Sequence, residues 1–271
     1  MVVALHFQCK MIFASWNVNS IRVRLSNISK WINKRKPDFI LFQEIKCQNE
    51  DFPEIFFKDL GYKSFINGQK GRNGTAILVL EKLWNKDDLI DSSEKLNFNS
   101  QARFIKYYFK NLNIHICNIY APNGNPINEK EKFDYKLNWY DELKSYIKPF
   151  IENEAKIIVG GDFNVLENSE DAKNFLDWEK DALGDIKIRK KFRSILGLGM
   201  TNISRNFFEP GKLYSFWDYQ KSAWERNYGL LIDHFICSPH VAEKIVKFGV
   251  DSETRGWDRP SDHAPIWIEL Y

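Results

Sequence analysis

The sequence predicts a single α/β domain in which two β-sheets pack together and helices cover their outer faces. Two observations support this fold class. Apolar runs typical of strands alternate with helical patterns along the whole chain. No Gly/Ser/Pro-rich linker or low-complexity segment divides the 271 residues, and their 44% hydrophobic content is ample for one large core.

The first half of the chain is expected to begin with a strand at residues 11–17, where the sequence MIFASWN is mainly apolar. Residues 20–36 follow as a helix that Pro37 stops, because proline cannot continue the helical hydrogen bonding. The run from Asp38 to Glu44 is apolar until its last two residues, which is typical of a buried strand with polar groups at its end. Further strands are expected at residues 75–80, 103–109 and 113–120.

The second half continues the alternation. A long helix is expected at residues 129–153, followed by a strand at 156–161 that leads into Asp162. Helices are expected across 172–196, and the remaining strands near 214–217, 231–237 and 265–270.

The N-terminal residues and the cysteines bear on the cellular setting. We expect residues 1–10 to be an extension outside the folded core, 11–271 to be the single domain, and Met1 and Met11 to be alternative starts. Residues 1–9 lack the basic start, long apolar core and cleavage site of a signal peptide, and no stretch reaches the roughly 18 apolar residues of a membrane helix. The 4 cysteines form no C-x-x-C pair. This composition favours reduced thiols in a cytoplasmic protein.

The net charge of +3 is weakly basic, so the distribution of charge is more informative than its sum. Basic residues cluster at 30–36 and at 187–193. Each cluster fits either a solvated helix face or a surface that contacts nucleic-acid phosphates, and both interpretations stay open.

Acidic, amide and imidazole side chains gather where expected strands end. Asn17 and Asn19 are two residues apart at one strand end, and Asp162 and Asn164 repeat that spacing at another, so each pair is expected to share a face. Turn formation is the alternative role for both pairs. Glu44 ends an apolar strand, where a carboxylate is costly unless it is paired or bound to a metal; an exposed strand end is the alternative.

Asp233 lies within the apolar run Leu230–Ile236, and a buried aspartate often orients an imidazole. His234 is adjacent in the strand and should point to the opposite face, which leaves His263 of the Ser-Asp-His segment as the better partner. Jointly, these acids, amides and imidazole predict metal-assisted hydrolysis of a phosphate ester.

The sequence resembles exonuclease III-type apurinic/apyrimidinic endonucleases of the endonuclease/exonuclease/phosphatase superfamily. The resemblance extends from about residue 11 to the last residue. It is carried by the segments Trp16–Arg22, Leu41–Lys46, Gly68–Leu78, Asn118–Gly124, Gly160–Asn164, Phe216–Tyr219, Ile232–Phe235 and Pro260–Pro265. The Gln-Glu-Ile-Lys, Gly-Gln-Lys-Gly and Tyr-Ala-Pro-Asn-Gly pieces are the more specific ones and point to the DNA-repair branch.

The resemblance implies a four-layer α/β sandwich with two facing, mixed and mostly antiparallel sheets. It implies a nuclease that uses Mg²⁺, or Mn²⁺ as a substitute, to cut duplex DNA 5′ to abasic sites. It also implies 3′→5′ exonuclease and 3′-phosphatase activity at 3′ ends. A monomer without an obligate protein partner or membrane attachment is expected, acting on the nucleoid in a bacterial cytoplasm.

The resemblance also implies roles for individual residues. Glu44 would hold the metal with Asp262 and Asn19 near it, while Asn17 and Asn164 would grip the scissile phosphate. Asp233 would orient His263, and either Asp162 or His263 would be the general base. The remaining residues would contact phosphate, leaving group, DNA or bare sugar: Tyr120, Lys136, Arg72, Phe216 and Trp217.

Two positions depart from the family pattern: Leu231 replaces a common Arg, and Asn202 replaces a common Asp, so both are expected to alter DNA contacts. Two other functions remain as alternatives. A superfamily phosphoesterase acting on inositol phosphates or phospholipid head groups would not require the Gly-Gln-Lys-Gly loop. A catalytically inert DNA-binding module would not require the complete set of acidic, amide and imidazole residues.

Overall fold

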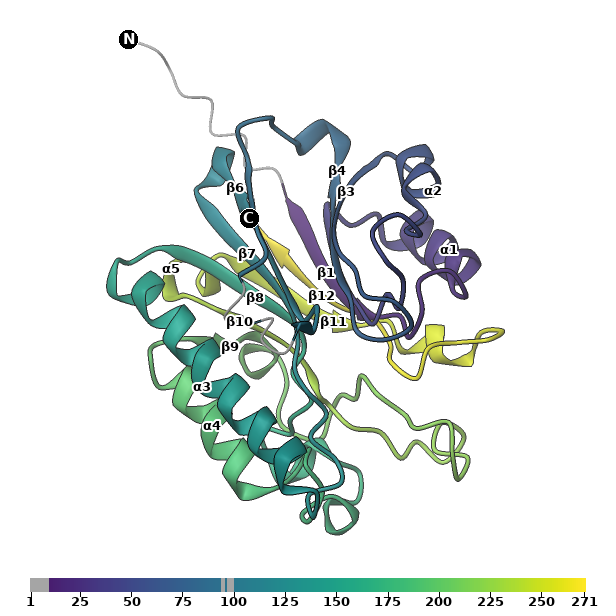
Figure 1. The fold of residues 1–271 in the computed structure, drawn as a ribbon, viewed down its shortest axis with the longest axis vertical. Helices are drawn as coiled ribbons and strands as arrows, with labels where there is room; N and C mark the ends of the chain where they lie inside the picture. Colours follow the sequence, from purple (N-terminus) through teal and green to yellow (C-terminus); the bar gives the residue numbers. More distant parts are fainter. Residues whose placement is uncertain (1–9, 94–95, 97–99) are drawn as a thin grey trace.

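The computed structural model describes residues 10–93, 96 and 100–271, which form two facing sheets with helices on both outer faces (Figure 1). The strands of the first sheet are β1 (Met11–Asn17), β2 (Phe39–Gln43), β3 (Tyr62–Asn67), β4 (Thr75–Leu80), β11 (Ile245–Val250) and β12 (Ile266–Leu270). Those of the second are β5 (Leu89–Asp91), β6 (Phe104–Phe109), β7 (Ile114–Tyr120), β8 (Lys156–Asp162), β9 (Thr201–Asn202) and β10 (Asp233–Cys237).

The order of strands is β11-β12-β1-β2-β4-β3 in the first sheet and β5-β6-β7-β8-β10-β9 in the second. The pairs β1–β2 and β7–β8 are parallel, and the other pairs are antiparallel. Helices α1 (Leu25–Arg35) and α2 (Glu54–Asp59) lie against the first sheet, and α3 (Lys130–Glu152) and α4 (Ile186–Leu196) against the second (Figure 1). Helix α5 (Pro239–Ala242) is a single turn. The expected four-layer sandwich is confirmed.

Alternation along β1 and β2 shows why their sequences are apolar throughout. Phe13, Phe39 and Leu41 face the second sheet and form the core between the sheets with residues such as Ile116. Their neighbours along each strand, such as Trp16, face the opposite way and pack against α1 and α2. A strand that is covered on both faces is mainly apolar along its length, and in β1 and β2 the buried polar residues lie toward the strand ends.

A buried polar bridge joins the two sheets directly beneath the edge where the motif residues lie. The Gln43 side-chain amide donates to Ser15 Oγ at 3.0 Å and to Asn118 Oδ1 at 2.8 Å. Asn118 in turn donates to the backbone oxygens of Phe42 at 2.9 Å and Ala76 at 2.8 Å. Because buried amides are costly without partners, this set fixes how β2 and β7 lie against each other.

Several expected elements differ from the structure. Residues 20–24 form a turn rather than helix, and in the stretch 172–196 the α-helix starts only at Ile186. Residues 214–217 form no strand; Phe216 makes isolated bridges to Leu230 and His263 instead. The sequence interpretation also missed α2, α5, β3, β5, β9 and β11. These elements are short or lie at sheet edges, where one face is solvated and the apolar pattern is weak.

The expectations for the N-terminal extension fall on residues 1–10, of which only Lys10 lies inside the described part of the chain. Cys47, Cys117 and Cys237 are buried free thiols, as expected. Among the described helices, none has the length and apolarity needed to cross a membrane.

Candidate active site

The motif residues converge at one edge of the sandwich, where strands from both sheets end or begin. Asn17 ends β1, Glu44 follows β2, and Asp162 ends β8, whereas the antiparallel strand β10 begins at Asp233. His263 lies just before β12, in the loop that brings the chain back to the same edge. The side chains that the sequence separates by more than 200 residues therefore share one site.

Asp162, Asp233 and His263 form its buried centre. His263 Nδ1 lies 2.9 Å from Asp233 Oδ2, and His263 Nε2 lies 3.8 Å from Asp162 Oδ2. Ser215 Oγ donates to the same Asp233 oxygen at 2.5 Å. Asp162 and Asp233 are each 1% exposed and His263 is 4% exposed, so solvent screens their charges little. The expected orientation of His263 by Asp233 is present.

Burial and charge shift the pKa values of this centre. Burial and the nearby Asp233 carboxylate raise the pKa of Asp162 to about 7, although His263 acts in the opposite direction. Burial alone would lower the pKa of His263, but the Asp233 and Asp162 carboxylates outweigh it and raise that pKa to about 10. The imidazole is therefore held as a cation at neutral pH, whereas Asp162 is placed to exchange a proton there.

Asn17 connects this centre to Glu44. Its side-chain nitrogen donates to Glu44 Oε1 at 3.0 Å and to Asp162 Oδ2 at 3.0 Å. Asn164 donates through its side chain to the Ala121 carbonyl at 2.9 Å and lies 3.3 Å from Asp162 Oδ2. The two amides expected to grip phosphate thus hold the carboxylates in place in this structure.

The geometry at Asn19 and Asn164 corrects one detail of the sequence interpretation. Both residues have positive φ, at 44° and 48°, so neither continues a strand beside Asn17 or Asp162. Instead the backbone nitrogen of Asn19 donates to Asn17 Oδ1, and that of Asn164 to Asp162 Oδ1. Asn and Asp favour such turns because their short side chains bond the backbone two residues on. Asn19 and Asn164 therefore form turns, as the alternative interpretation expects, and they also lie next to the site residues.

Glu44 and Tyr120 meet at the mouth of the site. The Tyr120 hydroxyl donates to Glu44 Oε1 at 2.8 Å. Burial raises the pKa of Tyr120 well above its usual range, so its hydroxyl stays a proton donor at neutral pH. Burial alone would raise the pKa of Glu44, but Lys46, Asn17 and His263 together lower it below its ordinary value. Glu44 is consequently ionised.

The oxygens of Glu44, Asn19 and Asp262 form a second group of polar atoms beside this centre. Asn19 Nδ2 donates to Asp262 Oδ1 at 3.1 Å, while Asn19 Oδ1 and Glu44 Oε2 both contact the Lys46 ammonium. Two oxygens that converge on one cation are suitably placed for another, and carboxylate and amide oxygens are the ligands that Mg²⁺ and Mn²⁺ prefer. These residues fit a divalent metal.

A different grouping is also close enough to hold a metal. Ligand atoms of Asp162, Asp233 and His263 all lie within 4.8 Å of one another. Within this group His263 Nδ1 and Asp233 Oδ2 are already 2.9 Å apart in a hydrogen bond, and a protonated imidazole is not a ligand. The Glu44 group is therefore the better candidate metal site.

Lys136 is fully buried and does not reach the surface of the described structure. Its ammonium donates to three backbone carbonyls: Asn123 at 2.9 Å, Asn164 at 2.6 Å and Ala182 at 2.6 Å. Burial lowers the pKa of Lys136 to about 7, but three acceptors match the three hydrogens of the charged form. Lys136 thereby ties the loop that follows β8, including Asn164, to two other loops.

The two aromatic residues expected against the sugar have different surroundings. The ring of Phe216 is partly exposed and contacts His263 edge-on, with centroids 4.9 Å apart. Trp217 is 2% exposed and packs on Trp224, and its indole nitrogen donates to Asn227 Oδ1 at 3.1 Å. Only Phe216 presents a surface to the site.

Arg72 is exposed near the tip of the loop between β3 and β4. That loop is fixed next to the residues after β2, because Lys46 N donates to Asn73 O at 3.0 Å and Ile45 N to Gly74 O at 3.2 Å. Asn73 has a φ of 47° and Gly74 of 88°, a tight turn that needs residues tolerant of positive φ. The loop that carries Arg72 thus lies next to the segment that carries Ile45 and Lys46.

The departures Leu231 and Asn202 are buried, at 1% and 4% exposure. Asn202 lies 3.2 Å from His234 Nδ1 and donates to Glu167 Oε2 at 2.7 Å, on the opposite face of β10 from the site. His234 indeed points away from His263, as the sequence predicts, and reaches the Val165 carbonyl at 3.0 Å. Neither departure is therefore placed for direct contact with DNA.

Two residues of the basic cluster on α4 make side-chain contacts within the protein. Lys191 bonds Asp141 at 2.6 Å, and Arg193 donates to the Glu167 carbonyl at 2.7 Å. In the cluster at 30–36, Lys34 pairs with Glu253 at 2.5 Å. For Lys34, Lys191 and Arg193, these contacts favour the interpretation as part of a helix face over contact with nucleic-acid phosphates.

The sequence interpretation gave no role to three residues of the site. Lys46 contacts two of the candidate metal ligands, and Ser215 bonds Asp233. The Tyr219 hydroxyl lies 3.4 Å from Asn19 Nδ2 and donates to the Pro260 carbonyl at 2.8 Å. Lys46 and Tyr219 lie inside the segments that carry the family resemblance, which was the available signal; Ser215 had none.

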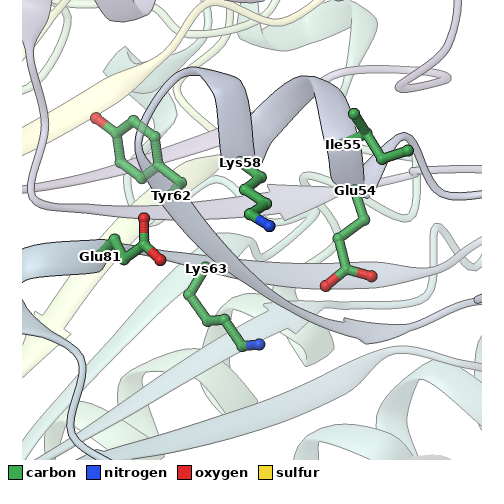
Figure 2. A pocket seen from close by; sticks show the side chains of 6 residues that line it. All are labelled: Glu54, Ile55, Lys58, Tyr62, Lys63 and Glu81. Atoms are coloured by element: carbon green, nitrogen blue, oxygen red, sulfur yellow. The ribbon is translucent and has the colours of Figure 1, made fainter.

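A pocket of about 360 Å³ lies elsewhere, between α2, β3 and the turn after β4. Figure 2 shows Glu54, Lys58 and Lys63 among the side chains around it. It shares no residue with the candidate active site.

Comparison with known proteins shows the family of this chain. A model of the Endonuclease/Exonuclease/phosphatase family matches residues 14–263. Exodeoxyribonuclease III of Haemophilus influenzae is 30% identical over 271 residues, which cover 96% of this chain and 100% of the relative.

Solved structures agree as well. An AP endonuclease from Archaeoglobus fulgidus has a TM-score of 0.87 and 31% identity, covering 95% of this chain and 98% of its own. The 3′-5′ exonuclease NExo of Neisseria meningitidis has a TM-score of 0.86 and 30% identity, covering 96% and 99%. NExo is also described as a 3′ phosphatase and has been solved with a product DNA hairpin. The family model, the sequence relatives and the solved structures therefore show that this chain belongs to the endonuclease/exonuclease/phosphatase family.

Proposed function

We propose that this protein is a divalent-metal-dependent DNA-repair nuclease. It hydrolyses the phosphodiester 5′ to abasic sites and also acts at 3′ ends, as 3′→5′ exonuclease and 3′-phosphatase. The observation that carries the proposal is the buried Asp233–His263–Asp162 centre, which Asn17 links to the ionised Glu44. Relatives that cover nearly the whole chain are exodeoxyribonuclease III and AP endonucleases, which supports DNA as the substrate.

Asp162 is the proposed general base. A general base works best when its pKa lies near the operating pH, and burial raises the pKa of Asp162 to about 7, so that at neutral pH a large fraction of this carboxyl is deprotonated and able to accept a proton. His263 carries its proton already, since the carboxylates of Asp233 and Asp162 raise its pKa. The imidazolium is suited to binding a phosphate oxygen and neutralising the charge that develops there.

The other site residues have supporting roles in this proposal. Glu44, Asp262 and Asn19 would hold Mg²⁺, which when bound would neutralise charge on the phosphate oxygens. Tyr120 would shift its hydroxyl hydrogen from Glu44 to the phosphate or the leaving oxygen. The amides of Asn17 and Asn164 would turn from their carboxylate partners toward the phosphate. Arg72, exposed on the loop bonded to Lys46, would contact the DNA backbone.

Phe216 supports selectivity for abasic sites. A nucleotide without its base costs little stacking energy to extrude, and an apolar ring beside His263 can accept the bare sugar. The same proposal has three further parts. The ion is Mg²⁺, the protein is a monomer without an obligate partner, and it acts on the nucleoid in the cytoplasm.

The test is incubation of the purified protein with a duplex that carries one abasic-site analogue, in Mg²⁺ or in EDTA, followed by a denaturing gel. A metal-dependent nick immediately 5′ to the analogue supports the proposal. Binding of the duplex without a nick would indicate an inert binder. If the protein neither binds nor cuts DNA, release of phosphate from inositol phosphates should be measured instead.

A further inference from the structure

Lys46 holds the position between two of the proposed metal ligands. Its Nζ lies 2.8 Å from Glu44 Oε2 and donates to Asn19 Oδ1 at 2.5 Å. Both oxygens are the atoms that remain available, because Glu44 Oε1 accepts from Asn17 and Tyr120 and the Asn19 amide nitrogen faces Asp262. An ammonium and a divalent ion therefore need the same two oxygens.

The backbone keeps Lys46 at this position. Glu44 and Lys46 both have positive φ, at 50° and 52°. The backbone nitrogen of Lys46 donates to Asn73 O at 3.0 Å, which attaches the segment to the neighbouring loop. The lysine side chain is 30% exposed, so the ammonium can swing into solvent without unfolding the loop.

The charges of the site determine how strongly the Lys46 ammonium opposes binding of a divalent ion. Glu44 and Asp262 each contribute one negative charge, Asn19 contributes none, and Lys46 offsets one of the two. A divalent ion that approaches Glu44 is repelled by the ammonium and must displace it. When the ion is absent, the ammonium pairs with the Glu44 carboxylate and offsets its buried charge.

We propose that Lys46 is the resident counter-cation of the metal site. Its ammonium and the divalent ion bind Glu44 and Asn19 in mutually exclusive fashion. Lys46 thus weakens metal binding to the free protein and stabilises the protein when metal is absent. The inference rests on the proposed function, because it takes Glu44 and Asn19 as metal ligands.

The experiment measures Mn²⁺ binding to the intact protein without DNA, from the electron paramagnetic resonance signal of free Mn²⁺. Lys46→Met removes the charge and keeps an unbranched side chain, whereas Lys46→Arg keeps the charge. Lys70→Met is the matched control, since Lys70 is an exposed lysine on the neighbouring loop. Glu44→Gln tests the ligand assignment itself.

We expect Lys46→Met to bind Mn²⁺ about tenfold to thirtyfold more tightly than the wild type. This is the size of a unit charge's repulsion of a divalent ion at contact distance in a water-like dielectric. Lys46→Arg should stay close to the wild type, and Lys70→Met should not change the affinity. Unchanged or weaker binding by Lys46→Met would overturn the inference.

Thermal unfolding supplies a second readout that does not depend on activity. In EDTA, Lys46→Met should unfold at a lower temperature than the wild type, because the Glu44 carboxylate loses its partner. Saturating Mn²⁺ should then raise the unfolding temperature of Lys46→Met more than that of the wild type. Equal gains in both proteins would contradict competition between the ammonium and the ion.

Failure of the inference and failure of the proposed metal site give different results. If Glu44→Gln abolishes Mn²⁺ binding while Lys46→Met leaves it unchanged, the metal site stands and the role of Lys46 is wrong. If Glu44→Gln binds Mn²⁺ as the wild type does, the proposed ligand set is wrong, and the inference is overturned with it.

Discussion

Asp162 and Asp233 are directly opposite each other across the antiparallel strands β8 and β10. Two like charges at such a cross-strand pair are destabilising unless a positive group joins them. His263 supplies that group, at 2.9 Å from Asp233 and 3.8 Å from Asp162. Burial is the main cause of the raised pKa of Asp162, and the strand register adds the repulsion of Asp233 to it.

The rate of DNA cleavage should depend on the protonation of Asp162. Burial raises the pKa of this carboxyl to about 7, and a base must lose its proton to act, so activity should rise as pH increases through about 7. An ordinary aspartate would be fully ionised by about pH 5. Single-turnover rates between about pH 5 and about pH 9, at saturating Mg²⁺ and DNA, measure the dependence. A rate that has reached its plateau by about pH 6 would contradict the raised pKa.

Loss of the His263 side chain should block chemistry while leaving DNA binding intact. We expect His263→Ala to bind abasic duplex but to cleave it roughly 10³-fold more slowly, the scale for loss of one group that stabilises the charge developing on the phosphate, and added Mg²⁺ should not restore the rate. Glu44→Ala should be crippled as well but partly restored by excess Mg²⁺. His240→Ala, at an exposed histidine on α5, is the control. Near-normal turnover by His263→Ala would refute the assignment.

Substitution of Phe216 should change substrate selectivity, whereas substitution of its neighbour Trp217 should change stability. Phe216→Ala should reduce the preference for abasic over intact duplex, because the apolar surface beside His263 is lost. Trp217→Ala should lower the free energy of unfolding by about 3–5 kcal/mol, because it empties a buried site. Cleavage of both duplexes and urea unfolding of both variants give the two quantities. The interpretation fails if Trp217→Ala is as stable as the wild type.

Lys136 should act through the fold rather than through a contact with DNA. Lys136→Met leaves three buried carbonyls without donors and should lower the free energy of unfolding by about 2–4 kcal/mol. Lys132→Met, at an exposed lysine on the same helix, should have little effect.

The salt dependence of DNA binding tests the alternative that Lys136 contacts phosphate. Removing a lysine that contacts phosphate lowers the slope of log affinity against log salt by about one. We expect that loss for Arg72→Met and not for Lys136→Met. A reduced slope for Lys136→Met would favour the phosphate contact that the family resemblance implies.

The sequence by itself determined the layers and the place of the site. Apolar runs without alternation predict strands covered on both faces, and β1, β4 and α3 lie within one residue of their expected limits. Acids and amides at strand ends predicted the edge at which Glu44, Asp162 and His263 meet. These features are local, because the burial of a strand and the chemistry at its end are both written in consecutive residues.

The tertiary structure alone decided which groups face each other. Phe216 and Trp217 are neighbours in the chain, yet one lines the site and the other is buried under Trp224. Lys136 is a polar residue in an amphipathic helix. Only the packing of three loops around it buries its ammonium and lets it bond a carbonyl of each loop. Side-chain direction in irregular segments, and contacts across long sequence separations, depend on sheet register and loop packing. No local pattern encodes these features.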